Sequence, residues 1–193
     1  MDPRVAKTRD AVMHTATELL VEHGPAALTM DAIVARSGVA KSTLYRHWAD
    51  RDALIADVFG FCLPNLTGPE ADLPFEASLR SIIQGVACLM ADEHWKRLVP
   101  ALLLLRNEKA AIRALDDQMK RNQVDVIGNA LRRGVEEGAL RPEVADEIEL
   151  AITLLVGPIL MACLVENIPT DGTLADVVVD QFLAANRVPT SSP

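Results

Sequence analysis

The chain has 193 residues, half of them hydrophobic and 24% charged, and its formal net charge at pH 7 is −8. This length and this apolar content suffice for a buried core and exclude a disordered or fibrous protein. The three cysteines, Cys62, Cys88 and Cys163, are widely spaced, which argues against a disulfide framework or a metal site and indicates a reduced cytoplasm.

The sequence predicts helices throughout and no sheet, because apolar residues recur at helical spacing and never alternate over a long run. A first helix is expected over residues 5–23, ending at Gly24. Thr29 is the expected N-cap of a short second helix, and Gly38 is its left-handed stop. A third short helix is expected over residues 40–47.

Asp50 is the expected N-cap of a fourth helix, which reaches Pro64. The stretch that follows contains prolines and glycines and is predicted to be a loop between two parts of the chain. We therefore expect two domains, residues 1–56 and residues 57–188, and a disordered tail, residues 189–193.

The second part is predicted to be a helical body. Its first helices are expected over residues 75–91, over a segment that Pro100 bends, and over residues 108–137. Gly138 is the expected stop of the long third helix.

Two C-terminal helices complete this body. Asp146 with Glu149, and Thr173 with Asp176, have the spacing of capping boxes, so each pair is expected to open one of these helices. The first contains the uncharged residues 150–165, fewer than the roughly 20 residues that a membrane span needs, so we predict a core helix and no membrane partner. Because it is apolar nearly all round, a second copy of the chain is expected to cover one side; the alternative is burial within one chain.

The negative charge is unevenly distributed along the chain. Residues 1–56 carry seven basic and seven acidic side chains, whereas the rest of the chain carries twelve and twenty. Residues 36–51 hold four basic side chains and one acidic side chain. Because phosphate attraction is screened within about 10 Å, such a local patch is compatible with nucleic acid as a partner. An ordinary solvated helix face is the alternative, and charge alone leaves both open.

The predicted second and third helices, joined at Gly38, have the geometry of a helix-turn-helix, whose second helix enters the major groove of DNA. In the third helix, Leu44 and Trp48 lie four residues apart and can pack inward. The other side chains offer hydrogen-bond donors: Lys41, Ser42, Thr43, Tyr45, Arg46 and His47. So short and polar a helix is not explained by core packing.

The segment from Thr29 to Leu54, TMDAIVARSGVAKSTLYRHWADRDAL, resembles the signature of the TetR family almost position for position. The resemblance is specific over residues 8–58, and the phrase LVGPIL at residues 155–160 is a weaker marker of the family's body. It implies an all-α protein, in which an N-terminal three-helix DNA-binding domain with a helix-turn-helix precedes a C-terminal helical bundle that dimerises.

The resemblance also assigns roles to single residues. It implies phosphate contacts by Thr29, Thr43, Tyr45 and His47, contacts with bases or adjacent backbone by Lys41 and Ser42, and a DNA contact of either kind by Arg46. Arg51 stands where the family usually has a lysine near a phosphate. The alternatives are that Thr29 is only a cap and His47 only a surface histidine.

Two positions depart from the family pattern. Ala40 stands where a serine often caps the recognition helix, which removes one contact. Trp48 replaces the usual phenylalanine, a change that we interpret as core packing.

The resemblance further implies a homodimer formed by the last two long helices, and a pocket in the body for a small, mostly apolar effector. Binding of the effector would release the dimer from a palindromic DNA operator. Four large or adaptable side chains are candidates for lining this pocket: Phe61, Trp95, Met119 and Met161. The alternative is that they are ordinary core residues.

Two other classes of protein compete with this interpretation. An enzyme is disfavoured because the sequence has no paired carboxylates, nucleophile elbow, phosphate-binding glycine loop or metal-ligand cluster, so we predict no catalytic residues and no cofactor. A helical protein-interaction module without DNA contact would not need the basic residues of the third helix. The sequence therefore predicts a cytoplasmic, ligand-responsive transcriptional repressor.

Overall fold

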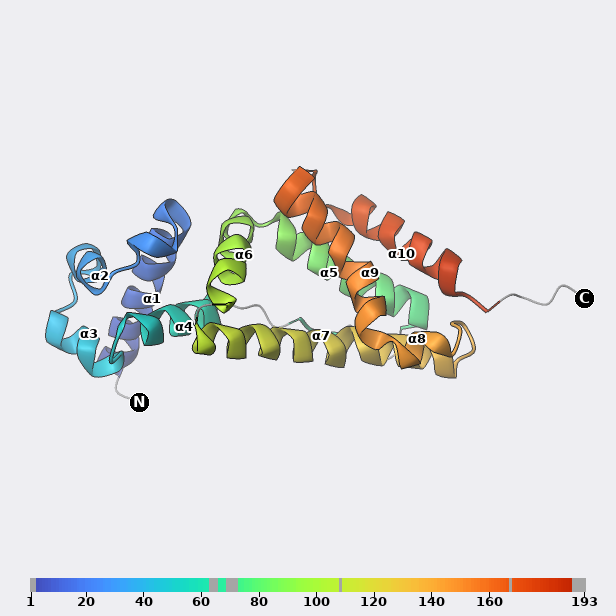
Figure 1. The fold of residues 1–193 in the computed structure, drawn as a ribbon, viewed down its shortest axis with the longest axis horizontal. Helices are drawn as coiled ribbons and strands as arrows, with labels where there is room; N and C mark the ends of the chain where they lie inside the picture. Colours follow the sequence, from blue (N-terminus) through green and yellow to red (C-terminus); the bar gives the residue numbers. More distant parts are fainter. Residues whose placement is uncertain (1–2, 63–65, 69–72, 108, 167, 189–193) are drawn as a thin grey trace, which may run out of the picture. The chain divides into compact units, whose positions relative to one another are not determined.

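The computed structural model describes residues 3–62, 66–68, 73–107, 109–166 and 168–188, without the side chains of residues 3–6 and 94. These residues form helices joined by loops (Figure 1), and the one β-type pairing among them is an isolated bridge between Leu140 and Arg187. The predicted all-helical fold is confirmed. The predicted disordered tail lies outside the described residues.

The chain divides into two compact units. The N-terminal unit is Met1–Pro64 with Arg97–Met119, and the C-terminal unit is Asn65–Lys96 with Lys120–Pro193. The N-terminal unit therefore includes a segment from the middle of the sequence as well as the first helices.

The helices that open the N-terminal unit begin and end at local sequence signals. Thr29 accepts a hydrogen bond from the backbone N–H of Ala32 at 3.1 Å, and Asp50 accepts one from Ala53 at 2.8 Å, as their predicted N-cap roles require. Their bounds are α1 Pro3–His23, the short 3₁₀ turn η1 Pro25–Ala27, α2 Met30–Ser37, α3 Lys41–His47 and α4 Arg51–Cys62.

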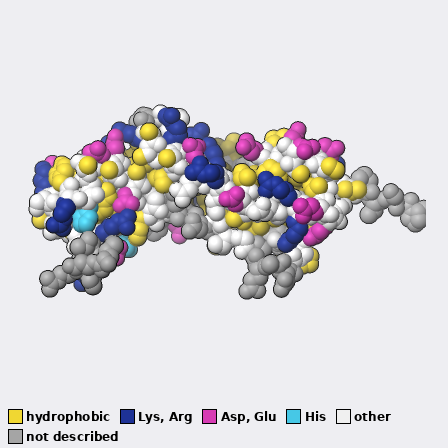
Figure 2. All heavy atoms as spheres, turned by 90° about the horizontal axis from the view of Figure 1, so that it is seen from below, with side chains coloured by type: hydrophobic (Ala, Val, Ile, Leu, Met, Phe, Trp, Pro, Cys, Tyr) yellow, Lys and Arg dark blue, Asp and Glu magenta, His cyan; other side chains and the backbone are white. Residues whose placement is uncertain are grey.

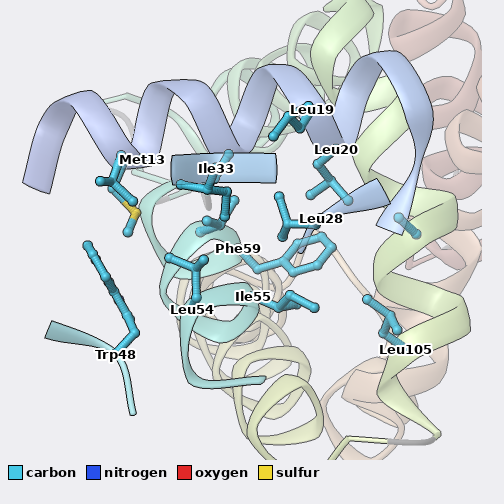
Figure 3. Close-up of a cluster of buried hydrophobic side chains, with 14 of the residues drawn as sticks. Met13, Leu19, Leu20, Leu28, Ile33, Trp48, Leu54, Ile55, Phe59 and Leu105 are labelled. Atoms are coloured by element: carbon cyan, nitrogen blue, oxygen red, sulfur yellow. The ribbon is translucent and has the colours of Figure 1, made fainter. Parts of the chain in front are cut away.

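A single apolar cluster holds the N-terminal unit together. Side chains from all four helices meet there. They are joined by Leu98, Ala101, Leu102 and Leu105 of α6 (Glu93–Arg106) and by Ile112 of α7 (Ala110–Glu136). Figure 3 shows Met13 of α1 facing Trp48, and Phe59 of α4 next to Leu28 and Ile55. Burying such side chains contributes roughly 1.5–3 kcal/mol each, so this cluster fixes how α3 sits on its neighbours.

The C-terminal unit is built around α5, whose predicted apolar face is buried against α9 and α10. In Figure 1 these three helices lie side by side. Phe75 at the start of α5 packs on Gly134 of α7, where a Cβ atom would come within 2.6 Å of the phenylalanine ring. Bounds in this unit are α5 Phe75–Ala91, α8 Glu143–Asp146, α9 Ile148–Met161, a π-helical segment Ala162–Glu166, and α10 Gly172–Asn186.

An ion-pair network also joins α5 to α10. Arg80 donates to Asp176 Oδ1 at 3.0 Å and to Asp180 Oδ1 at 2.6 Å, and the amide of Gln84 donates to Asp176 at 3.0 Å. The hydrogen bond from Arg80 lowers the pKa of Asp176 from its ordinary value.

Both predicted C-terminal capping boxes are wrong. Asp146 is the last residue of α8, and α9 begins after Glu147 without a side-chain cap, because residues 143–146 already form a helical turn. The N-cap of α10 is Asp171, which accepts hydrogen bonds from the backbone N–H groups of Thr173 and Leu174. Asp176 cannot serve as a cap partner because Arg80 and Gln84 bind its carboxylate.

One segment among the described residues, Ile148–Glu166, passes a test for a membrane span by length and composition alone. It has 19 residues and a mean hydropathy of 2.4 in its most apolar window, of which 44% is buried within the chain. The core helix of a soluble protein can be equally long and apolar. Length and composition therefore fit both the predicted core helix and a membrane-spanning helix.

Candidate nucleic-acid interface

The two helices of the predicted helix-turn-helix are joined by a tight left-handed turn. Gly38 has φ 69°, and its N–H donates to the carbonyl of Val34 at 3.1 Å, which closes the end of α2. A side chain at this φ would strain the backbone, so glycine allows α3 to begin after only two more residues. The resulting helix pair matches the motif that places its second helix in the major groove.

Helix α3 has one buried face and one exposed face. Leu44 and Trp48 are buried, as predicted from their spacing. Lys41, Ser42, Tyr45 and Arg46 are exposed. Lys41 and Tyr45 lie four positions apart, as do Ser42 and Arg46, so each pair stacks along the helix on its exposed side. Figure 2 shows Lys and Arg side chains, with histidine, exposed on the N-terminal unit at the left of the view. The exposed face of α3 is therefore polar along its length.

Most polar side chains on this face are available to a ligand. Ser42, Tyr45 and Arg46, together with the half-buried Thr43, make no side-chain hydrogen bond to another described residue. Hydroxyl and guanidinium groups of this kind bind phosphate oxygens and base edges.

Lys41 has an acidic partner that could not be predicted from the sequence. Its Nζ atom donates to Asp31 Oδ1 of α2 at 2.7 Å, and this hydrogen bond raises the pKa of Lys41. The two side chains remain 59% and 80% exposed, so water screens the pair. Asp31 is ten positions away and on another helix, beyond the reach of any local spacing rule.

The basic patch predicted over residues 36–51 is partly neutralised. Arg36 binds the carboxylates of Glu22 and Glu18 on α1, at 2.6 and 3.1 Å. Arg51 donates to the carbonyl oxygens of Leu28 and Pro25, at 2.6 and 2.5 Å. Arg46 is therefore the one cation of the patch without an ion pair or hydrogen bond to another described residue.

Thr29 and His47 lie at the two ends of the helix-turn-helix. The hydroxyl oxygen of Thr29 caps α2, yet the side chain is exposed, so capping and a phosphate contact are compatible. The Nε2 atom of His47 is buried and finds no hydrogen-bond partner among the described residues, and its ring lies 5.4 Å from that of Trp48. One of its two ring nitrogens is thus turned away from solvent.

The four predicted pocket residues occupy different environments. In the N-terminal unit Phe61 is exposed, with its ring edge-on to His14, and Met119 is half-buried against the apolar cluster. In the C-terminal unit Trp95 is buried and Met161 is exposed on α9. The sequence offered no signal that separates these environments, because all four residues are large and apolar.

One hollow at the surface of the C-terminal unit lies between α7 and α9. It has a volume of about 310 Å³ and is lined largely by polar side chains: Lys120, Gln123, Val124, Glu149, Ile152 and Thr153. None of the predicted pocket residues lines it. Within the described part of the chain, no group of three or more His, Cys, Asp or Glu residues could hold a metal ion.

Family models match two regions of the chain. Residues 12–58 match the model of bacterial regulatory proteins of the tetR family, and residues 74–182 match a tetracyclin repressor-like C-terminal domain. The first region contains the whole helix-turn-helix.

Individual proteins agree with these matches. The HTH-type transcriptional regulator YdeS of Bacillus subtilis (strain 168) is 28% identical over 184 residues, 93% of this chain and 90% of its own. A SmeT–triclosan complex is similar in fold, with a TM-score of 0.71, 22% identity and 97% of each chain covered. SmeT is the repressor of the Stenotrophomonas maltophilia multidrug efflux pump SmeDEF. The fatty acid degradation regulator FadR of Bacillus halodurans has a TM-score of 0.72 at 17% identity, with 91% and 94% covered.

Proposed function

Because the chain belongs to the TetR family of bacterial transcriptional regulators, we propose that it is a repressor that binds a palindromic operator as a homodimer and is released by a small effector. The observation that carries the DNA-binding part is the polar exposed face of α3 above the buried Leu44 and Trp48. A seven-residue helix packed in this way presents its free side chains to a groove rather than to the protein core.

On this proposal the residues of α3 divide between positioning and reading. Tyr45 and Thr43 bind phosphates through their hydroxyl groups, and Lys41 exchanges its bond with Asp31 for a phosphate or a base edge. Ser42 and Arg46 lie on the same exposed face and complete the contact with bases or backbone. Arg46, which has no ion pair or hydrogen bond to another described residue, can bind the O6 and N7 atoms of a guanine.

The three residues that flank this face contribute less directly. Thr29 adds a phosphate contact beside its cap role, and His47 contributes through the part of its ring that is not buried. Arg51, at the start of α4, donates to the carbonyl oxygens of Leu28 and Pro25. Its guanidinium group would therefore have to bind a phosphate in addition to these two oxygens.

Dimerisation is supported by an uncovered apolar surface on the last helices. Leu150, Leu154, Met161 and Val165 are exposed and follow one another at intervals of four or seven residues along one side of α9 and the π-helical segment. Val177 is exposed on the neighbouring α10. Large apolar side chains that cluster at the surface mark contact sites, and a second copy of the chain would bury them in a symmetric interface. Met161 suits this contact better than an effector pocket.

The effector is proposed to be small and mostly apolar and to bind among the helices of the body. The triclosan complex of SmeT is a precedent in a protein of similar fold. Met119 belongs to the N-terminal unit, so Trp95 is the remaining buried candidate within the C-terminal unit. Binding of the effector would release DNA by changing the spacing of the α3 helices of the two subunits. These helices must meet major grooves roughly 34 to 36 Å apart.

Selection of binding sites from a pool of random DNA tests the proposal. The purified protein should enrich an inverted repeat, because a two-fold symmetric dimer reads two half-sites. A Lys41→Ala, Tyr45→Ala double variant should lose affinity for that repeat, while the control Arg121→Ala, an exposed arginine of α7 in the C-terminal unit, should retain it. No enrichment, or equal affinity of all variants, would favour a protein-interaction module without DNA binding.

We also propose that the protein acts in the cytoplasm. Release of DNA by an effector has a test of its own. Apolar compounds that raise the protein's melting temperature should also weaken operator binding, because coupling between two sites is reciprocal. Compounds that stabilise the protein but leave operator affinity unchanged would contradict release by ligand.

A further inference from the structure

One carboxylate in the N-terminal unit joins three helices. Asp57 of α4 accepts a hydrogen bond from Trp48 Nε1 at 2.9 Å through Oδ2, and Arg9 of α1 donates from Nη2 to both carboxylate oxygens, at 2.7 and 2.8 Å. Trp48 is the residue at which α3 ends. The carboxylate therefore links α1, the end of α3 and α4.

Helix α3 has few other means of fixing its orientation. It has seven residues, and Ala40 provides no side-chain cap at its start. Helices this short are unstable by themselves and depend on packing. Leu44 and Trp48 anchor α3 in the apolar cluster, but dispersion contacts allow a helix to slide or rotate more readily than a directional hydrogen bond does.

The bond to Asp57 gives Trp48 a role beyond core packing. A phenylalanine at this position would fill the same apolar site next to Met13 but has no N–H to donate. Hydrogen bonds to an ionised acceptor are shorter and stronger than neutral ones. Arg9 holds the acceptor in place, and the side chains of Arg9 and Asp57 are only 42% and 34% exposed.

We propose that Asp57 is a positioning residue for α3: its carboxylate, held by Arg9, fixes Trp48 and thereby sets the orientation of the helix that contacts DNA. This inference rests on the proposed function of α3. Because Asp57 belongs to α4, a displacement of α4 within this unit would be transmitted to Trp48 through a single hydrogen bond.

The first test measures operator affinity by fluorescence anisotropy, at a temperature where circular dichroism shows each variant fully folded. Trp48→Phe and Asp57→Ala should each weaken binding by about tenfold, the lower end for losing a hydrogen bond to a charged group. Asp57→Asn keeps an acceptor for Trp48 and should recover part of the loss. Asp52→Asn is the matched control, because Asp52 also lies on α4 but pairs with Lys109 at 2.8 Å rather than with Trp48.

The double variant shows whether Asp57 acts through Trp48. In the Trp48→Phe background, Asp57→Ala should cost at most about twofold more affinity, because the bond that it supports is already absent. Full additivity of the two single losses would overturn the proposal.

The second test needs no DNA and so separates this inference from the proposed function. In α3, the backbone N–H of residue 44 donates to the carbonyl of Ala40, and that of residue 48 donates to the carbonyl of Leu44. Amide hydrogen exchange at these two positions should be severalfold faster in Trp48→Phe and Asp57→Ala than in Asp52→Asn. If Trp48→Phe and Asp57→Ala exchange at the rate of Asp52→Asn, the positioning role is overturned. This holds even if the Lys41→Ala, Tyr45→Ala double variant loses DNA binding. If that double variant binds DNA normally, the proposed function fails, and the exchange rates still decide whether Asp57 positions α3.

Discussion

Lys41 on the exposed face of α3 and Asp31 on α2 form an ion pair, with 2.7 Å between Nζ and Oδ1. The cation that we propose for DNA contact thus meets an acidic neighbour in the free protein, and binding to DNA places phosphates near both. Asp31 therefore acts against association, by occupying Lys41 and by repelling phosphate.

Asp31→Asn should raise the affinity for operator and for scrambled DNA alike, by about two- to fivefold at 0.1 M salt, because an exposed pair is a weak competitor. Anisotropy titrations on both DNAs measure this change. Glu136→Gln, an exposed acid on α7 in the C-terminal unit, is the control and should leave affinity unchanged. Unchanged or weaker binding by Asp31→Asn would mean that Lys41 does not approach DNA.

Lys41→Ala and Tyr45→Phe should separate charge from hydrogen bonding. Loss of one phosphate contact per half-site lowers the slope of log affinity against log salt by roughly 0.9 for each contact, so Lys41→Ala should reduce it by about 1.8 in a dimer. Tyr45→Phe removes a hydroxyl but no charge and should weaken binding at every salt concentration with little change in slope or sequence preference. Parallel salt titrations of both variants on operator and scrambled DNA give the slopes. Equal slopes for the two variants would contradict a phosphate contact by Lys41.

Leu154→Glu should convert the dimer to a monomer, because a buried unpaired charge at the proposed interface opposes association by several kcal/mol. Leu154 is 54% exposed within one chain, so folding of the chain itself should be little affected. Leu104→Glu, at a residue of α6 that is 68% exposed, should remain dimeric and serves as the control. Sedimentation equilibrium over a range of concentrations measures both. A concentration-independent monomer for the unmutated protein would remove the dimer from the proposal.

Asp171→Ala should destabilise the fold by about 1 kcal/mol, the usual loss for an N-cap whose side chain binds backbone N–H groups. Thr173→Ala should change stability much less, because its backbone N–H rather than its side chain takes part in the cap. Urea unfolding of the two variants compares them directly. A larger loss for Thr173→Ala would restore the capping box predicted from the sequence.

Arg80→Gln should make stability less sensitive to acid. The hydrogen bond from Arg80 depresses the pKa of Asp176 below 3.8, so its stabilising effect is present above that pH and is lost as the pH falls through the lower folded-state value. The difference in urea midpoint between the unmutated protein and Arg80→Gln should therefore be constant from pH 5 to 7 and shrink below about pH 4. Arg97→Gln, which loses a bond to the carbonyl of Val21, should show no such trend.

The helix-turn-helix could be predicted from the sequence alone, because the signals that build it act within a few residues. The cap at Thr29, the stop at Gly38 and the pair Leu44 and Trp48 each depend on neighbours at most four positions away. The same locality made the buried face of α5 predictable, since helical spacing alone places its apolar residues on one side.

Which polar groups among the described residues have a partner depends on tertiary packing and could not be predicted from the sequence. Capping-box spacing at residue 173 could not reveal that Arg80, 96 positions before Asp176, binds that carboxylate. Nor could local pattern reveal that Arg51 reaches back to Leu28, or that Trp48 has a carboxylate to bind. These contacts join helices that are distant in sequence, and their partners are set by how apolar faces pack in three dimensions, which no periodicity along the chain encodes.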